Sequence, residues 1–229
     1  MHPTIEYILF DLDGTLYSSH WGLEQEVSGR VNDYLASYLN LPREEARTLR
    51  KERIMAGGYG TTLEWLRAEM NFKDAEIDRY YAYIHPEDEV DVLTPDPALR
   101  SFLLSFSSRN ITIGVLSNSP TEHVQRVLQK LGVADLFHSA FDIRKNGFTG
   151  KPVAAMYHKI LKELGVTAPS CMLVDDMLFY IKGYLAVGGT GVYIDENNSH
   201  PEYTGLKIQK LTDLTSLRRS DGSLLLPEM

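Results

Sequence analysis

The chain has 229 residues, of which 43% are hydrophobic and 24% charged, proportions that are ordinary for a folded globular protein. Its formal net charge is −8, whereas proteins that bind nucleic acid or acidic membranes usually carry an excess of basic residues. We therefore expect neither partner. The single cysteine, Cys171, leaves no intrachain disulfide and no cysteine zinc site. The chain shows no signal-peptide pattern and no apolar run of membrane-spanning length. We therefore expect a cytoplasmic monomer or homodimer.

Short apolar runs alternate with helical segments along most of the chain, a pattern typical of a parallel sheet built from βαβ units. Strands are expected at residues 5–10, 111–116, 171–174 and 191–194, with a weaker candidate at 140–143. The pattern therefore predicts an α/β fold.

Helices are expected between these strands, where capping residues and glycines mark their ends. Ser119 and Glu122 form a candidate capping box, so Ser119 is expected to cap a helix that ends near residue 131 rather than to serve a site. The other helices of this part are expected after Asp96, over 153–164, and from 178 towards Gly188.

Residues 18–90 break the alternation, because this stretch contains no convincing strand. Apolar residues at helical spacing predict a first helix, Pro42 opens a second, Thr61 and Glu64 make a capping box for a third, and 74–83 reads as a fourth. We therefore expect a core formed by residues 1–17 and 91–229, and an inserted all-helical cap formed by 18–90. Placed over the sheet, such a cap would act as a lid.

Asp11 and Asp13 follow directly after the first apolar run, in Phe-Asp-Leu-Asp-Gly-Thr. Residues two apart on an extended segment face the same way, so both carboxylates are expected to converge beyond the strand end. Two adjacent carboxylates repel, and Mg²⁺ held by carboxylates and substrate phosphate would relieve the repulsion. Asp-x-Asp-Gly alone is more often a solvated turn, but a position after a buried strand favours a ligand site.

Ser117 follows the next strand, and its hydroxyl and backbone N–H are candidates to bind a phosphate oxygen with help from Asn118. The alternative, that Ser117 only caps the next helix, stays open. Lys151 lies in Phe-Thr-Gly-Lys-Pro, where it is expected to contact the phosphate and Asp11 together. An isolated lysine is ordinarily a surface residue, but here it would offset the charge of several carboxylates.

Asp175 and Asp176 end the apolar run at 171–174 and are expected to complete a metal shell opposite Asp11. Adjacent aspartates are common in surface turns, and only the buried strand before them favours a functional role. Asp176 is expected to coordinate directly. Asp175 has three open roles: it coordinates directly, it coordinates through water, or it only orients Lys151.

In this order and spacing, the four segments resemble the motifs of the haloacid dehalogenase-like (HAD) superfamily of phosphohydrolases. The first motif corresponds to residues 11–15, the second to Ser117, the third to Lys151, and the fourth to the pair Asp175 and Asp176. The resemblance covers nearly the whole chain. It implies a Rossmann-like parallel sheet with helices on both faces and a helical cap inserted after the first motif.

The resemblance also implies roles. Asp11 would be the nucleophile that forms an aspartyl-phosphate, and Asp13 would be general acid and then general base, with its backbone carbonyl on Mg²⁺. The metal and Lys151 would stabilise charge on the transferred phosphoryl group. A halide leaves without a proton, so an acid at Asp13 favours phosphate ester cleavage over dehalogenation.

Within the superfamily, the chain is most similar to pyrimidine 5′-nucleotidase-like proteins. The similar segments are Gly-Tyr-Gly-Thr-Thr-Leu at 58–63, His-Pro at 85–86, Leu-Thr-Pro-Asp-Pro at 93–97, and the residues 141–143 and 147–148 before Lys151. The chain departs from these proteins at Gly14, at Gly150 and in the apolar run Met-Leu-Phe-Tyr-Ile-Lys after Asp176.

The leading hypothesis is a Mg²⁺-dependent phosphatase of small phosphorylated metabolites, acting on pyrimidine nucleoside 5′-monophosphates. Tyr59 and Thr61 are candidates to contact the leaving group, although Tyr59 is more simply explained as a loop aromatic packed on the cap. The alternatives are a sugar phosphate, phosphoglycolate or flavin nucleotide phosphatase, and a phosphomutase. A catalytically silent binding module is a further alternative, which the presence of Asp11, Asp13 and Lys151 disfavours.

Overall fold

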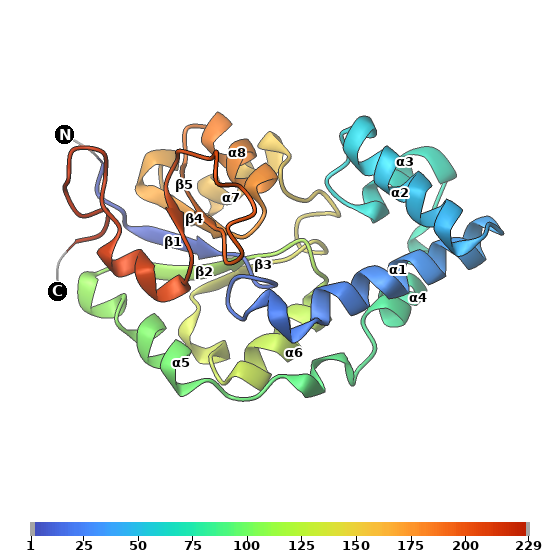
Figure 1. Cartoon of the computed structure of the whole chain (residues 1–229), viewed down its shortest axis with the longest axis horizontal. Coiled ribbons are helices and arrows are strands. Elements are labelled where there is room, and N and C mark those ends of the chain that lie inside the picture. Colours follow the sequence, from blue (N-terminus) through green and yellow to red (C-terminus); the bar gives the residue numbers. More distant parts are fainter. Residues whose placement is uncertain (1–2, 228–229) are drawn as a thin grey trace.

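The computed structural model describes residues 3–227 and shows a twisted sheet with helices on either side, next to a separate group of helices (Figure 1). All six strands of the sheet are parallel, in the order β3-β2-β1-β4-β5-β6. The predicted α/β, Rossmann-like fold is confirmed. The strands are β1 Tyr7–Phe10, β2 Thr112–Leu116, β3 Ser139–Phe141, β4 Cys171–Asp175, β5 Thr190–Ile194 and β6 Lys207–Ile208.

The weakest predicted strand is displaced in the structure. It was expected at 140–143, whereas β3 covers Ser139–Phe141 and pairs only with β2. Since β2 ends at Leu116, opposite Phe141, the chain has no strand to pair with beyond that point and turns instead. The two-residue strand β6 was not predicted, because so short a segment has no alternation to recognise.

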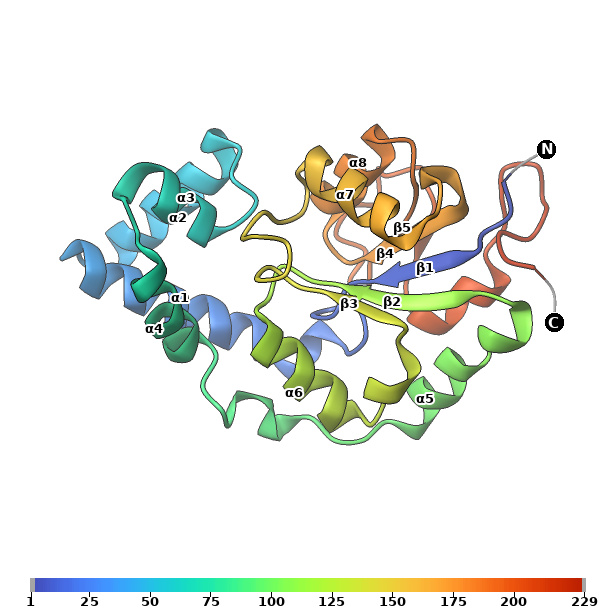
Figure 2. The same ribbon diagram turned by 180° about the vertical axis from the view of Figure 1, so that it is seen from behind.

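The two faces of the sheet are covered by different helices, because successive side chains of a strand point to opposite sides. Ile8 and Phe10 of β1 pack in one apolar cluster with α5 Pro97–Leu104 and α6 Thr121–Leu131. Tyr7 and Leu9 pack in a second cluster with α7 Ala154–Leu164 and α8 Leu178–Ala186. Figure 2 shows the two helix pairs on opposite sides of the strands. The strands are therefore buried on both faces, as their nearly continuous apolar sequences require.

The remaining long helices come from the stretch that lacked strands. They are α1 Leu23–Leu39, α2 Arg43–Gly57, α3 Thr62–Met70 and α4 Asp74–Ile84. They pack in a third apolar cluster around Trp65 and Leu66. The predicted capping box of α3 is confirmed: Thr61 Oγ1 accepts from the N–H of Glu64, whose carboxylate accepts from the N–H of Thr61. We call α1 to α4 the cap; its boundaries at residues 18 and 90 stay a prediction.

Short 3-10 helices connect the longer elements. They are η1 Ser19–Trp21, η2 Glu89–Val92, η3 Ser107–Arg109, η4 Ala134–Leu136, η5 Ala168–Ser170 and η6 Leu211–Ser216. Among residues 3–227, no helix has both the length and the apolar character needed to cross a membrane. The sequence does not show whether residues 220–229 form a docked strand or a loose tail. The described part of this segment is docked, with Leu225 and Leu226 in the first apolar cluster, whereas residues 228–229 lie outside the described residues.

The burial of Cys171 leads to a first prediction. The side chain is fully buried in β4, and burial raises the pKa of its thiol to about 11. The folded protein is therefore expected not to react with iodoacetamide at pH 8, because both access and the thiolate are lacking. Mass spectrometry would follow the alkylation, with guanidinium-unfolded protein as the control that reacts once per chain. Rapid alkylation of the folded protein would contradict the placement of β4 in the core.

Candidate active site

The predicted site residues meet at one edge of the sheet. Asp11 directly follows β1, Ser117 follows β2, and Asp175 ends β4. β1 lies between β2 and β4 and is parallel to both, so the three strands deliver these side chains to the same edge. This is the edge where open α/β sheets bind ligands. The convergence expected from the sequence is therefore present.

Lys151 lies between two of the carboxylates. Its Nζ is 2.8 Å from Asp11 Oδ1 and 2.6 Å from Asp175 Oδ2, and its side chain is fully buried. Burial alone would lower the pKa of Lys151, but the two carboxylates outweigh burial and raise it. The Tyr180 ring, whose centroid is 5.0 Å from Nζ, covers the ammonium and comes from the apolar run that departs from the family pattern. Lys151 is therefore a permanent buried cation, and Asp175 holds it in place.

The backbone around Lys151 is fixed from both sides. The Asn118 side chain accepts from Lys151 N at 2.7 Å and donates to Lys151 O at 3.1 Å. On the cap, Glu64 accepts from Gly150 N at 2.9 Å. A Cβ at Gly60 would lie 2.5 Å from Lys151 O, so only glycine permits this approach of the cap. The Asn118 amide, predicted to help bind substrate, is thus occupied in positioning Lys151.

A carboxylate cluster beside Lys151 fits a divalent cation. Asp11, Asp175 and Asp176 each place an oxygen within 4.8 Å of the others. Burial, followed by the charges of Asp11 and Asp175, raises the pKa of Asp176 to about 9, and its Oδ1 is buried without a hydrogen-bond partner. One lysine does not balance three carboxylates. Oxygen donors with excess negative charge are the ligands that Mg²⁺ prefers.

Gly14 is required by the same cluster. Its φ is +70°, and a Cβ there would lie 2.4 Å from Asp176 Oδ2. Any other residue would be strained and would displace this carboxylate. Glycine at this position, where the chain departs from the family pattern, therefore leaves the space that the Asp176 carboxylate occupies.

The carboxylate of Asp13 does not join the cluster, and the expectation that it projects beside Asp11 from an extended strand is wrong. β1 ends at Phe10, and Asp13 lies in a turn in which Leu12 O accepts from the N–H of Leu16. The Asp13 carboxylate is still near enough for its charge to raise the pKa of Asp11, after the larger effect of burial.

Three side chains hold the Asp13 carboxylate. Oδ1 accepts from the Tyr17 hydroxyl and lies 2.8 Å from His123 Nε2, while Oδ2 accepts from Ser119 Oγ at 2.8 Å. Burial alone would raise the pKa of Asp13, but His123 and the two hydroxyls hold it well below its usual value. The ligation of a metal by the Asp13 carbonyl stays a prediction.

The predicted capping role of Ser119 is wrong. α6 begins at Thr121 with Pro120 as its cap residue and no side-chain cap, while Glu122 pairs with Arg144. The Ser119 hydroxyl instead donates to Asp13, because the loop after β2 turns it into the site. Ser117 Oγ accepts from Ser119 N at 3.0 Å, and Ser117 N donates to Phe141 O within the sheet. Of the two groups proposed on Ser117, only the hydroxyl proton remains for a phosphate oxygen.

His123 and Glu89 were not identified from the sequence. His123 Nδ1 is 2.6 Å from a Glu89 oxygen, and a carboxylate can only accept, so Nδ1 donates to Glu89. Burial lowers the pKa of His123, but Asp13 and Glu89 outweigh burial and raise it to about 9, so Nε2 donates to Asp13. A histidine at an apolar position of α6 was the available signal. Glu89 also accepts from His85 (2.9 Å), Arg126 (2.9 Å) and Arg30 (3.3 Å).

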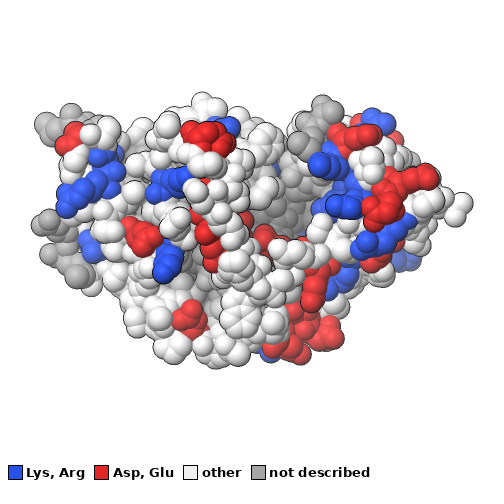
Figure 3. Space-filling view, in the orientation of Figure 1, with Lys and Arg blue, Asp and Glu red and all other residues white. Residues whose placement is uncertain are grey.

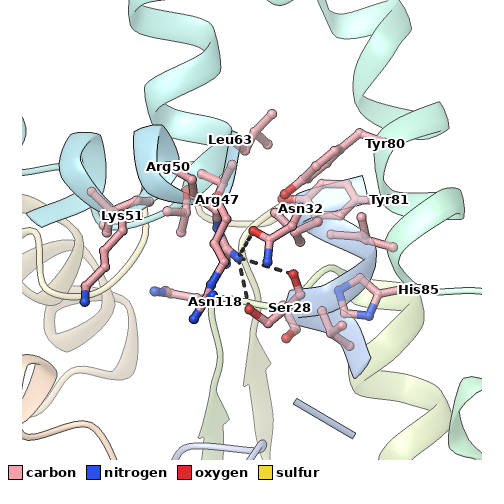
Figure 4. A pocket seen from close by; sticks show the side chains of 18 of the residues that line it. Ser28, Asn32, Arg47, Arg50, Lys51, Leu63, Tyr80, Tyr81, His85 and Asn118 are labelled. Carbon is pink, nitrogen blue, oxygen red and sulfur yellow. Dashed lines mark hydrogen bonds between the residues drawn. The ribbon is translucent and has the colours of Figure 1, made fainter. Parts of the chain in front are cut away.

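A pocket of about 480 Å³ lies between the cap and this edge of the sheet (Figure 4). On the sheet side its walls include Asn118, Ser119 and Tyr180, which contact Lys151 or Asp13 directly. Figure 3 shows the surface hollowed between the cap and the sheet domain, with Lys and Arg side chains on the cap side. Thr61 lines the pocket while it caps α3. Tyr59 does not line it: its hydroxyl donates to Glu69, and its ring packs on the cap cluster.

The Lys151 contacts lead to a second prediction. Lys151→Met should lower the free energy of unfolding by about 3–5 kcal/mol without metal, because two buried carboxylates lose their cation. Mg²⁺ should stabilise the wild type and recover part of the loss in the variant, since a metal bound only by the folded state stabilises it. Urea denaturation in EDTA and in Mg²⁺ would measure both effects.

Lys159→Met on the exposed face of α7 is the matched control, and should change stability little. Equal stability of the Lys151 and Lys159 variants would contradict the charge balance described above.

Known proteins share both the sequence pattern and the fold. A family model for haloacid dehalogenase-like hydrolases matches residues 5–183. The chain is 27% identical over 228 residues to a glyceraldehyde 3-phosphate phosphatase of Methanocaldococcus jannaschii, covering 95% of this chain and 100% of that protein. It is 28% identical over 181 residues to a phosphoglycolate phosphatase of Rhodospirillum rubrum, covering 74% and 70%.

A crystal structure of a HAD phosphatase from Thermococcus onnurineus has the same fold, with a TM-score of 0.64 at 20% identity over 96% of this chain and 100% of that one. The structural likeness supports the fold, and the family model spans most of the chain, including every motif in the site. The chain therefore belongs to the haloacid dehalogenase-like hydrolases.

Proposed function

We propose that this protein is a Mg²⁺-dependent phosphatase that hydrolyses phosphate monoesters of small metabolites through an aspartyl-phosphate on Asp11. The observation that carries the proposal is the pair of aspartates in different surroundings. Asp11 lies beside Lys151 and the carboxylate cluster, whereas the carboxylate of Asp13 is turned towards His123, Tyr17 and Ser119. Two carboxyl groups with distinct environments suit a nucleophile and an acid–base group.

In the first step, a carboxylate oxygen of Asp11 attacks phosphorus and the bond from phosphorus to the substrate oxygen breaks. Asp13 is ionised in the resting site, so it would take a proton from the His123 imidazolium and pass it to the departing alkoxide, which is a poor leaving group without it. In the second step, Asp13 takes a proton from water, whose oxygen attacks phosphorus and releases phosphate from Asp11. The proton that Asp13 takes from water would recharge His123. Splitting the displacement in this way replaces one difficult step by two easier ones.

The other residues have supporting roles in this scheme. Lys151 and the Ser117 hydroxyl would bind phosphoryl oxygens, and His123 orients Asp13 from the core side. Asp11, Asp176 and the Asp13 carbonyl would hold Mg²⁺, which would supply positive charge for the transferred phosphoryl group. Asp175 is assigned to Lys151, because one of its oxygens binds the ammonium and the other accepts from Met177 N.

Two substrate classes fit the proposed chemistry. Pyrimidine nucleoside 5′-monophosphates are supported by the sequence resemblance of residues 58–63 and of the segments that connect the cap to the core. Small anionic metabolites such as phosphoglycolate and triose phosphates are supported by the names of the relatives and by the basic residues of the pocket. Thr61 is the pocket residue from the resemblance that remains a candidate substrate contact, and Tyr59 could act only through the position of the cap loop.

Asp11→Asn is expected to abolish turnover and leave the fold intact, because the amide has nearly the same shape but is no nucleophile. Phosphate release would be measured with UMP, CMP, AMP, FMN, sugar phosphates, phosphoglycolate and glyceraldehyde 3-phosphate, in Mg²⁺ and in EDTA. Release that requires Mg²⁺ and is absent from the variant supports the proposal. Wild-type activity in Asp11→Asn would overturn the assigned roles.

The panel also separates the alternatives. The highest kcat/KM with UMP or CMP would favour the nucleotidase. The highest kcat/KM with phosphoglycolate or glyceraldehyde 3-phosphate would keep the chemistry and discard that assignment. A folded, Mg²⁺-binding protein that releases no phosphate would instead indicate a phosphomutase or a silent binding module.

His123 provides a further prediction. His123→Asn places its amide near Glu89 and leaves Asp13 without the ring donor, so kcat should fall by about 10²-fold, on the scale of acid–base catalysis. KM should change little, because His123 does not line the pocket. His123→Gln reaches further towards Asp13 and should retain more activity. Steady-state kinetics would compare both with His158→Asn on the exposed face of α7. Equal kcat values in all variants would show that Asp13 needs no support.

A further inference from the structure

Arg50 presents a cation to the pocket from α2. Its Nε donates to Thr62 Oγ1 at 3.0 Å, and its Nη1 donates to Ser28 Oγ at 3.0 Å and Asn32 Oδ1 at 3.1 Å (Figure 4). These partners are neutral side chains of α1 and α3. These hydrogen bonds orient the guanidinium group but do not neutralise its charge. Arg50 is half-buried, and no hydrogen bond from Nη2 is formed within residues 3–227.

No carboxylate compensates Arg50 in the part of the chain that the structure describes. No Asp or Glu forms an ion pair with it, and none lines the pocket. This is unexpected in a chain with 31 acidic and 23 basic residues. Burial lowers the pKa of Arg50, as expected where desolvation is not offset by an anion. A desolvated cation without a counter-ion is costly, and natural proteins retain one chiefly where a ligand completes it.

Two further cations of α2 line the same pocket. Lys51 forms no ion pair within residues 3–227, and Arg47 is paired only with the exposed Glu44 of its own helix. Residues 47, 50 and 51 lie within about one helical turn, so they present their charges to one region. The opposite wall of the pocket is formed by Asn118, Ser119 and Tyr180, which adjoin Lys151 and Asp13. A substrate with its phosphate at Asp11 would therefore direct its leaving group towards these cations.

We propose that Arg50, with Lys51 and Arg47, binds a second anionic group on the leaving part of the substrate. The substrate class is then a phosphate monoester that also carries a carboxylate or a second phosphate. This inference rests on the proposed phosphatase function and narrows its substrate. It disfavours nucleoside 5′-monophosphates, whose leaving group is a neutral nucleoside.

A structural role for Arg50 is the main competing explanation, because its hydrogen bonds join α1, α2 and α3. Such a role predicts lower stability and an equal loss of activity on every substrate. An anion site predicts a loss that depends on substrate charge. The two explanations differ in the ratio of kcat/KM between substrates that differ only in that charge.

The experiment uses three pairs of esters matched in skeleton. Two pairs differ in a carboxylate: 2-phosphoglycolate with ethyl phosphate, and 3-phosphoglycerate with glycerol 3-phosphate. One pair differs in a phosphate: fructose 1,6-bisphosphate with fructose 6-phosphate. The wild type should prefer the more anionic member of at least one pair by about tenfold in kcat/KM, the scale of one hydrogen bond between charged groups. The pair with the largest ratio of kcat/KM values shows whether the second anionic group is a carboxylate or a phosphate.

Arg50→Gln should remove most of that preference, and Arg50→Lys should keep part of it. Arg53→Gln is the matched control, because Arg53 lies on the same helix, pairs with Glu69 and does not line the pocket. It should leave the preference unchanged. If Arg50→Gln fails to fold, Lys51→Gln replaces it, since Lys51 is exposed and makes no ion pair, and a reduction of about threefold in the preference is then expected.

Three results would overturn the inference. The wild type shows no preference in any pair, Arg50→Gln lowers kcat/KM equally for both members, or UMP exceeds every anionic ester. If no ester is hydrolysed at all, the proposed function fails, and ligand-induced shifts of Tm still decide the subsite. The anion subsite is supported if 3-phosphoglycerate raises the Tm of the wild type but not of Arg50→Gln, and glycerol 3-phosphate raises neither. Equal shifts would overturn it.

Discussion

The structure depends on the neutralisation of charge at the carboxyl edge of the sheet. Two neighbouring parallel strands, β1 and β4, bring their acidic residues to one place, which repulsion alone would not allow. Lys151 relieves part of it by lying within 2.8 Å of Asp11 and 2.6 Å of Asp175, fully removed from water. The buried Asp176 oxygen, which has no hydrogen-bond partner among residues 3–227, marks where a cation would bind. A divalent cation would complete this balance, and the site could then accept a substrate phosphate.

The same requirement organises the surroundings of the site. Lys151 can bridge two aspartates only if its backbone is held, and Asn118 from the sheet edge and Glu64 from α3 of the cap hold its segment. The cap thus helps to position Lys151 and is more than a cover. A second network of alternating charges runs from Asp13 through His123 to Glu89, where Arg30 of the cap joins it. Through this network Asp13, the proposed acid–base group, is tied to the segment that connects cap and core.

Electrostatics also divides the site into two parts. The sheet edge concentrates negative charge and needs cations, whereas the pocket above it is lined by cations of α2 and by no carboxylate of residues 3–227. A substrate with phosphate at one end and an anion at the other would complement both parts. The net charge of −8 gives no hint of this local reversal. The distribution of charge, and not its sum, determines which ligand such a site would accept.

The sequence by itself determined the α/β fold, the strand ends that carry Asp11, Ser117 and Asp175, and the capping box at Thr61. These features depend on local patterns of apolar residues and caps, which a linear sequence displays. It did not determine where side chains point after a strand ends. Asp13 lies in a turn and faces His123, and Ser119 binds Asp13 instead of capping α6.

Only the tertiary structure decided these contacts, because they join residues about 100 positions apart in the chain, such as Asp13 and His123. The same holds for Arg50, an unremarkable helical arginine in the sequence. Its meaning arises because, once α1, α2 and α3 are packed, no carboxylate among residues 3–227 pairs with it or lines its pocket. Apolar periodicity records which residues are buried, whereas the compensation of a buried charge depends on neighbours that only folding brings together.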